Sequence, residues 1–331
     1  MRLTVLAHGD SDGVASASLV RAALAGTYDE MGVYFTHPYH LLRDFREFAS
    51  GDVVIVDVAL SEGVWREFLA ELAGYGGRVT YIDHHPLPRG LNERQLDSLV
   101  ESVRTDGSAS EATFRHYSGM LDPDYDRVAL YGAIADYSDT TRWVSESLGR
   151  WDRRQIYFEA GILFQGLEGS RRMHDFKREV VNHLSGNRRP SSHGELVRRA
   201  LKQAARNEEL YGWAREMLRV AGCVGYLIDP PGSVGIAATY ARGMGRVPVG
   251  LAAERRGGIY SMSLRGDGTV DLNSILRELT PRLGGSGGGH RDAAGARIPV
   301  DRLDELIEGI NEAICGSRLE GSVPCCPPGS G

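Results

Sequence analysis

Four short segments of the chain place metal-binding side chains at the end of apolar runs that have the composition of buried β-strands. They are His8-Gly9-Asp10-Ser11-Asp12-Gly13, Asp57 in VVIVDVAL, Asp83-His84-His85 in RVTYIDHHP, and Asp136 in YGAIADYSD. Carboxylates and imidazoles crowded into a buried site repel and desolvate one another unless a cation lies among them. A fold that brings these ends together therefore predicts a cation site, and a pair of divalent metal ions is its simplest occupant.

Strand-like and helix-like patterns alternate through the first half of the chain, which favours βαβ units and a mostly parallel sheet. Runs such as VVIVDV are apolar on both faces, as central parallel strands covered by helices are. We expect strands at 3–8, 31–35, 52–60 and 78–82, and helices at 13–26, 64–72 and 108–118. The apolar segment 128–135 fits a helix or a strand equally well.

The length of 331 residues favours two domains. The expected division is a first α/β domain at 1–185, a helical linker at 186–218, a smaller α/β domain at 219–316, and a disordered tail at 317–331. The segment GNRRPSSHG, which begins at Gly186, is the expected hinge because it interrupts a predominantly helical stretch.

Composition is that of a soluble globular protein, with 42% hydrophobic and 25% charged residues. No apolar run approaches the roughly 20 residues that span a bilayer, so no membrane partner is expected. Four cysteines without a CxxC pair indicate a reduced, cytoplasmic protein that has no structural zinc.

The net charge of −6 hides a basic stretch at 150–219, which has fifteen Lys/Arg against nine Asp/Glu. Two interpretations of this stretch stay open. It is either a solvated helical face or a track for a phosphate backbone beside the active site.

Ligands of open parallel sheets bind beyond the carboxyl ends of the strands, where the segments at His8, Asp57 and Asp83 would meet. A single Asp at such a place is more often a turn residue or a helix N-cap, and Asp124 or Asp139 could be taken for Asp136. The coincidence of all four segments argues against a purely structural role. Mixed carboxylate and imidazole ligands suit Mn²⁺, and a bridged metal pair suits phosphoryl chemistry.

These residues carry a family resemblance. HGDSDG, the isolated Asp57, the literal DHH at Asp83–His85 and the IAD ending at Asp136 resemble motifs I to IV of the DHH phosphoesterases. The late segment GGSGGGHRDAAG, at 284–295, resembles the DHHA1 substrate-binding domain with its GGGH loop. The HxDxD form of the first motif is closer to the RecJ branch than to nanoRNases or family II pyrophosphatases. The chain is far shorter than bacterial RecJ and lacks room for its extra domains, so it resembles compact archaeal nucleases of the family, such as the Hef-associated nuclease.

The resemblance implies an N-terminal DHH catalytic domain, a helical linker and a C-terminal DHHA1 domain. It also implies a site that holds two Mn²⁺ ions, with Mg²⁺ or Co²⁺ as substitutes. Three kinds of metal ligand follow: those of one ion (His8 and Asp10), those of the other (Asp12, His84 and Asp136), and a bridge (Asp57).

The remaining site residues that the resemblance implies handle the substrate. Asp83 would orient a neighbouring imidazole. His85 would contact the scissile phosphate. Arg265 and His290 would clamp a phosphate or terminal nucleotide, with Gly288 and Gly289 letting the backbone approach it.

The predicted function is an exonuclease on single-stranded nucleic acid, with DNA favoured. The family resemblance favours the 3′→5′ direction. One alternative is a nanoRNase, a phosphatase on 3′-phosphoadenosine 5′-phosphate, or a cyclic-dinucleotide phosphodiesterase. A second alternative is a non-catalytic replication scaffold, which is disfavoured because this chain keeps every ligand. Expected partners are DNA or RNA ends or short oligonucleotides, a helicase or repair protein, and further copies of the chain.

Overall fold

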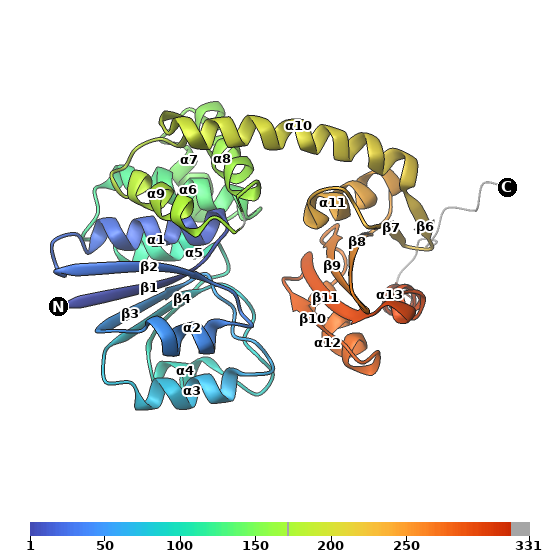
Figure 1. Cartoon of the computed structure of the whole chain (residues 1–331), viewed down its shortest axis with the longest axis horizontal. Helices are drawn as coiled ribbons and strands as arrows, with labels where there is room; N and C mark the ends of the chain where they lie inside the picture. Colours follow the sequence, from blue (N-terminus) through green and yellow to red (C-terminus); the bar gives the residue numbers. More distant parts are fainter. Residues whose placement is uncertain (171, 319–331) are drawn as a thin grey trace. The chain divides into compact units, whose positions relative to one another are not determined.

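The computed structural model describes residues 1–170 and 172–318, which form two compact units. The first unit is Met1–Gln203 and the second begins at Ala204, and each has its own sheet (Figure 1). The division falls within the predicted linker 186–218, and helix α10 (Gly194–Met217) runs through it. A single 3₁₀ turn, η2 (Pro190–Ser192), precedes α10 at the expected break.

The sheet of the first unit is parallel throughout and has the strand order β2-β1-β3-β4-β5, which confirms the predicted parallel α/β fold. Its strands are β1 (Arg2–His8), β2 (Glu30–Thr36), β3 (Asp52–Val56), β4 (Val79–Asp83) and β5 (Glu101–Arg104). The predicted third strand was too long, because β3 ends at Val56 rather than at residue 60. Strand β5 was not predicted, since its short sequence ESVR contains no apolar run.

Helices cover both faces of this sheet (Figure 1). Helices α2 (Leu41–Phe48), α3 (Trp65–Gly74) and α4 (Glu93–Asp97) pack on one face against Leu6, Ile55 and Tyr81. Helices α1 (Ser11–Ala23) and α5 (Ala109–His116) belong to the core of the other face, which includes Val5 and Val56. The same core continues into α6 (Asp126–Ala135), α7 (Arg142–Leu148), α8 (Arg153–Glu168) and α9 (His174–Ser185). Successive strand residues thus point into alternate cores, as the pleat requires.

The ambiguous segment 128–135 is the helix α6, so Asp136 follows a helix and not a strand. The expectation that all four metal-binding segments end strands was therefore wrong for the fourth. The segment is buried on nearly every side, from Val128 to Ala133. An element hidden all round lacks the polar face that would have revealed a helical period.

The second unit has a mixed sheet with the strand order β10-β11-β9-β8-β7-β6. The strands are β6 (Arg219–Ala221), β7 (Val224–Ile228), β8 (Val249–Arg256), β9 (Ile259–Gly266), β10 (Ser286–Gly289) and β11 (Ala293–Pro299). Helix α11 (Val234–Gly245) packs on one face with the end of α10, through residues such as Leu210 and Ala238. Helices α12 (Leu272–Arg282) and α13 (Leu303–Arg318) cover the other face. This unit is the predicted smaller α/β domain.

Two further expectations concern the end of the chain and membranes. Helix α13 extends to Arg318, and the rest of the tail predicted at 317–331 lies outside the described residues. No helix among the described residues combines the length and the apolar character needed to cross a bilayer.

Candidate metal centre

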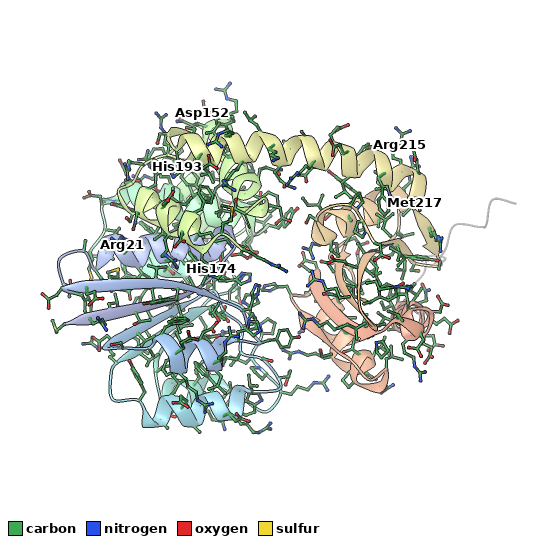
Figure 2. The ribbon with its side chains drawn as sticks, viewed as in Figure 1. Arg21, Asp152, His174, His193, Arg215 and Met217 are labelled. Atoms are coloured by element: carbon green, nitrogen blue, oxygen red, sulfur yellow. The ribbon has the colours of Figure 1, made fainter. Side chains whose placement is uncertain are left out.

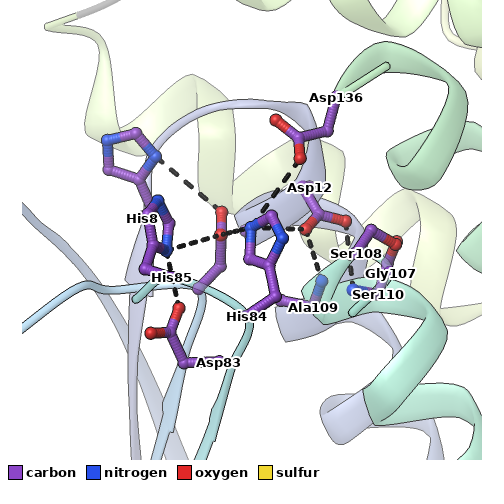
Figure 3. Close-up of polar contacts among 12 residues, drawn as sticks. His8, Asp12, Asp83, His84, His85, Gly107, Ser108, Ala109, Ser110 and Asp136 are labelled. Atoms are coloured by element: carbon purple, nitrogen blue, oxygen red, sulfur yellow. Dashed lines mark hydrogen bonds and ion pairs between the residues drawn. The ribbon is translucent and has the colours of Figure 1, made fainter. Parts of the chain in front are cut away.

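The structure brings all six predicted metal ligands to the carboxyl edge of the first sheet. His8, Asp12, His84 and Asp136 are labelled in Figure 3. Within each of two groups, one ligand atom from every residue lies within 4.8 Å of the others. The first group is His8, Asp10 and Asp57, and the second is Asp12, His84 and Asp136. His84 links the groups, because its Nε2 lies 3.3 Å from Oδ1 of Asp57. A further group, Asp57, Asp83, His84 and His85, shares a residue with each of these two.

The first group follows β1 and β3. His8 is the last residue of β1, and its Nδ1 lies 2.8 Å from Oδ2 of Asp10 and 3.8 Å from Oδ2 of Asp57. Asp10 caps α1 by accepting a hydrogen bond from the Gly13 backbone at 3.1 Å. Gly13 is required for this tight start, because a β-carbon there would clash with the His8 carbonyl oxygen. The capping interaction explains how a segment that carries two carboxylates, exposed Asp10 and buried Asp12, can begin a helix.

Asp57 is the most constrained residue of the centre. It directly follows β3, with φ of 58° in the left-handed region, and its backbone N–H donates to the Ile82 carbonyl at 2.9 Å. Asp tolerates this conformation better than most residues, but the strain costs on the order of 1 kcal/mol. The side chain is only 3% exposed, and its Oδ2 accepts no hydrogen bond from the described residues. A buried carboxylate oxygen without a donor is costly.

The electrostatics of Asp57 favour a cation. Burial raises the pKa of Asp57 well above its usual value, and the nearby carboxylates of Asp10, Asp12, Asp136 and Asp83 raise it further. A divalent ion would remove both causes, because it supplies positive charge and a partner for the oxygen that lacks a donor. The mixed carboxylate and imidazole donor set also fits such an ion. The residues present therefore fit a metal centre.

Backbone N–H groups of α5 hold the carboxylate of Asp12 in the second group. Ala109 N donates to Oδ2 at 2.7 Å, and Ser110 N donates to Oδ1 at 3.0 Å (Figure 3). These donors belong to the first turn of a helix, which also carries a partial positive charge. Gly132 of α6 leaves room for the arrangement, since a β-carbon there would lie 2.8 Å from Oδ1 of Asp12. Burial nevertheless raises the pKa of Asp12, with His84 opposing the shift.

His84 lies between the two carboxylates of its group. Its Nε2 is 3.9 Å from Oδ2 of Asp12 and 3.7 Å from Oδ2 of Asp136 (Figure 3). Asp136 is the C-cap of α6, and its side chain is 30% exposed. The second group therefore draws its ligands from α1, the end of β4 and the end of α6.

A network behind the metal ligands orients His85. Its Nδ1 lies 2.8 Å from Oδ1 of Asp83. Oδ2 of Asp83 accepts from the Tyr81 hydroxyl at 2.9 Å and from Nη1 of Arg104 at 3.3 Å. Arg104 also donates to the His85 backbone carbonyl. Burial opposes ionisation of Asp83, but His85, His84 and Arg104 hold its pKa below the usual value.

Sequence reasoning missed Arg104 and the α5 residues that hold Asp12. Arg104 sits on the unpredicted strand β5, directly opposite Asp83 in the ladder. A register prediction would have found it, but no local signal marks so short a strand. The α5 donors were visible as Ser108-x-x-Glu111, the pattern of a helix start, and Ser108 does accept from the Glu111 backbone. Only the three-dimensional fold reveals that this start faces Asp12.

The predicted substrate-binding residues lie together within the second unit. Arg265 of β9 is opposite Ala293 of β11, and Gly289 of β10 is opposite Ala294, so both lie at the same end of the sheet. The GGGH segment is an edge strand and a tight turn rather than a free loop. His290 N donates to the Ala293 carbonyl at 2.8 Å to close that turn.

Glycine is required in the GGGH segment. Gly288 and Gly289 have φ of 157° and 149°, in a region that residues with a side chain avoid. A β-carbon on Gly289 would lie 2.7 Å from the Ala293 carbonyl oxygen. Asn273 of α12 accepts from the Gly289 backbone at 3.1 Å and fixes the segment from the other side.

Comparisons with known proteins agree with both units. A family model described as the DHHA1 domain matches residues 221–315. The whole structure is similar to that of RecJ from Thermus thermophilus in complex with Mn²⁺, with a TM-score of 0.69 and 18% identity. That match covers 98% of this chain and 53% of the other, so the chain spans about half the length of that protein. A structure of the exonuclease RecJ bound to manganese matches with a TM-score of 0.63 and 17% identity. This match covers 98% of this chain and 91% of the other.

The family model places residues 221–315 in the DHHA1 domain family, and the chain as a whole shares its fold with the RecJ structures. The chain is also similar in fold to a pGpG-specific phosphodiesterase, PggH from Vibrio cholerae. The TM-score is 0.56 at 12% identity, over 95% of this chain and 99% of the other. A curated alanine–tRNA ligase from Korarchaeum cryptofilum is 43% identical over 56 residues, which are 17% of this chain and 6% of that protein. These structural likenesses show the fold alone.

Proposed function

We propose that this DHH/DHHA1 chain is a metal-dependent phosphodiesterase that removes nucleotides from an end of single-stranded nucleic acid. DNA and the 3′→5′ direction are the favoured substrate and polarity. The observation that carries the proposal is the pair of ligand groups that meet at Asp57, where a buried carboxylate lacks a hydrogen-bond donor. The RecJ-like fold supports nuclease chemistry, and the DHHA1 unit supports recognition of a nucleotide terminus.

Two Mn²⁺ ions are the proposed cofactors, with His8 and Asp10 holding one, Asp12, His84 and Asp136 holding the other, and Asp57 bridging. Such ions would neutralise phosphate oxygens and make a water molecule nucleophilic at neutral pH. The chain's own residues position this chemistry. The α5 donors fix Asp12, the left-handed backbone aims Asp57 between the groups, and Asp83 holds the His85 ring.

His85 is the proposed contact to the scissile phosphate. With Nδ1 at hydrogen-bond distance from Asp83, a proton on Nδ1 donates to that carboxylate, and the ring can carry a second proton on Nε2. A donor fixed in this way stabilises negative charge that develops on a phosphate oxygen during displacement. In the second unit, Arg265 and His290 are the proposed clamps for the terminal nucleotide.

A second candidate function is hydrolysis of very short substrates such as dinucleotides, and the fold shared with the pGpG-specific phosphodiesterase favours it. The two candidates differ in how many phosphates the protein engages. A strand exonuclease contacts several phosphates and loses affinity steeply as salt rises, whereas a dinucleotide phosphodiesterase depends only weakly on salt.

The decisive assay uses DNA and RNA labelled at the 5′ or the 3′ end, from dinucleotides to strands of several tens of nucleotides, with Mn²⁺. Progressive shortening of 5′-labelled DNA from its other end, suppressed by salt, supports the exonuclease. Cleavage confined to the shortest substrates would replace it with the second candidate. Asp57→Asn is the inactive control, and Asp97→Asn, an exposed carboxylate at the end of α4, is the matched active one.

A further inference from the structure

Lysine is almost absent from this chain. Of its 38 basic residues only two are lysines, Lys177 and Lys202, and the rest are arginines. Lys202 is exposed on α10, as most lysines are. Lys177 is only 4% exposed, which is rare for a lysine and costly unless its charge is used. A buried lysine in a chain that otherwise uses arginine calls for a specific explanation.

The ammonium group of Lys177 lies over the backbone of the metal edge. Helix α9 begins at His174 (Figure 2) and places Lys177 one turn further. A β-carbon built on Gly9 would lie 2.6 Å from Nζ of Lys177, so Gly9 provides the space that this group occupies. Gly9 separates His8 from Asp10, two ligands of the first group. On another side, Nζ lies 5.7 Å from the centre of the Phe35 ring.

The positive charge of Lys177 reaches the imidazoles at this edge. Burial lowers the pKa of His37 to about 4, and His8, His40 and Lys177 add to the effect. The rings of His8 and His37 are 5.0 Å apart. Lys177 thus places positive charge beside the first ligand group, next to Gly9.

We propose that Lys177 binds a non-bridging phosphate oxygen of the substrate at the edge of the first ligand group. This inference rests on the proposed phosphodiesterase function and adds a phosphate contact from the catalytic unit itself. An ammonium is a compact point charge, and Nζ of Lys177 fills the space over Gly9, whereas the guanidinium of arginine is wider and planar. Because Lys177 lies beside His8 and Asp10, it would bind a phosphate oxygen at the first ligand group and not at the second.

Kinetics of two matched lysine variants test the contact. Lys177→Met keeps the length of the side chain and removes its charge, and should raise KM about ten- to a hundredfold, as loss of a charge-assisted hydrogen bond does. Lys202→Met is the control and should leave KM unchanged. Lys177→Arg should restore little of the affinity. A wild-type KM in Lys177→Met overturns the proposal.

A second measurement uses the unaltered protein, so it decides the question even if Lys177→Met fails to fold. Protein containing ¹³C-lysine gives side-chain NMR signals from only two residues, which Lys202→Arg assigns. Titration with thymidine 5′-monophosphate, in the presence of diamagnetic Mg²⁺, should shift the Lys177 signal saturably and leave that of Lys202 in place. A Lys177 signal unmoved by millimolar nucleotide contradicts the phosphate contact.

The outcomes also separate this inference from the proposed function. If nucleotide shifts the NMR signal of Lys177 but the protein hydrolyses no phosphodiester, the phosphate contact is supported and the proposed activity is rejected. Hydrolysis with an unmoved Lys177 signal keeps the activity and rejects the contact.

Discussion

At the scale of single residues, the site is built at a cost to stability. Asp57 combines a strained backbone, a buried oxygen without a donor, and a pKa raised by burial and by four neighbouring carboxylates. Each of these features destabilises the folded chain in the absence of a cation. Natural sequences accept such costs where function requires them. The cost itself is therefore measurable evidence for the role of the residue.

Asp57→Asn should stabilise the metal-free protein at neutral and higher pH while abolishing hydrolysis. Asparagine keeps the shape, tolerates the left-handed φ and removes the buried charge. We expect a gain of about 1–2 kcal/mol in the free energy of unfolding, as for other charge-optimising changes. Denaturant unfolding of the metal-free protein measures it.

The pH dependence of this gain has a definite sign. The pKa of Asp57 is higher in the folded chain than in the unfolded chain, where it is about 4. The contribution of Asp57 to stability is therefore fully present below about pH 4, and it is lost as pH rises through the pKa of the folded state. The advantage of Asp57→Asn should therefore vanish near pH 4 and grow toward pH 8. A variant less stable than wild type at pH 8 without metal would contradict the electrostatic account.

Arg104→Met should impair catalysis with little change in KM. The substitution removes the donors to Asp83 and to the His85 carbonyl, so the His85 ring loses its orientation. Supporting residues of this kind typically contribute about ten- to a hundredfold. The expected result is a fall of that size in kcat, a shifted pH–rate profile, and partial recovery in Arg104→Lys. Arg94→Met, on the exposed side of α4, is the control, and an unchanged kcat in Arg104→Met would refute the role.

At the scale of elements, the site depends on helix termini as much as on strand ends. The start of α5 supplies two backbone donors to Asp12, and the end of α6 supplies Asp136. Strand ends alone would have placed His8, Asp57 and His84 but left the second group incomplete. The helices thus complete a site that the parallel sheet begins.

Ala109→Pro isolates the contribution of the α5 terminus. Proline is accepted at the first position of a helix, and Ser108 already has the extended backbone that a following proline requires. The substitution removes the N–H that donates to Asp12 and places ring atoms there instead. We expect Mn²⁺ affinity at the second group to fall at least about tenfold, the usual effect of losing a supporting hydrogen bond. Helix content should be unchanged.

Calorimetric titration with Mn²⁺ measures the affinity, and circular dichroism measures the helix content. Arg153→Pro places the same residue at the first position of α8, away from the metal ligands, and should bind Mn²⁺ as wild type does. Equal affinity in Ala109→Pro and Arg153→Pro would show that the Asp12 hydrogen bond is dispensable.

The sequence predicted the site better than it predicted the elements around it. Apolar runs ending at His8, Asp57 and Asp83 located three strand ends, because central parallel strands have an unmistakable composition. The helix α6 stayed ambiguous because it is buried on nearly every side and shows no period. Arg104 and Lys177 were missed for a different reason. Their roles arise from strand register and helix packing, which bring residues distant in sequence together.

At the scale of the whole molecule, each unit has its own hydrophobic clusters. The first unit has one on each face of its parallel sheet, and the second unit has one on each face of its mixed sheet. All predicted metal ligands belong to the first unit. Ligand binding stabilises the unit that holds the ligand, so metal should act on the two units unequally.

Mn²⁺ should raise the melting temperature of the first unit by about 5–10 °C at a concentration one hundredfold above its Kd. Protection of amide hydrogens from exchange, read separately in β1–β5 and in β6–β11, distinguishes the two units. The effect should be confined to β1–β5 and absent in Asp57→Asn. Equal stabilisation of the second sheet by Mn²⁺ would contradict the assignment.

The central claim is that six side chains form one centre for two metal ions around Asp57. Anomalous diffraction at the manganese edge, from crystals grown with Mn²⁺, tests it most directly. The account predicts two peaks about 4 Å apart. One should contact His8 and Asp10, the other Asp12, His84 and Asp136, and both should contact Asp57. A single peak, or peaks elsewhere on the chain, would contradict it.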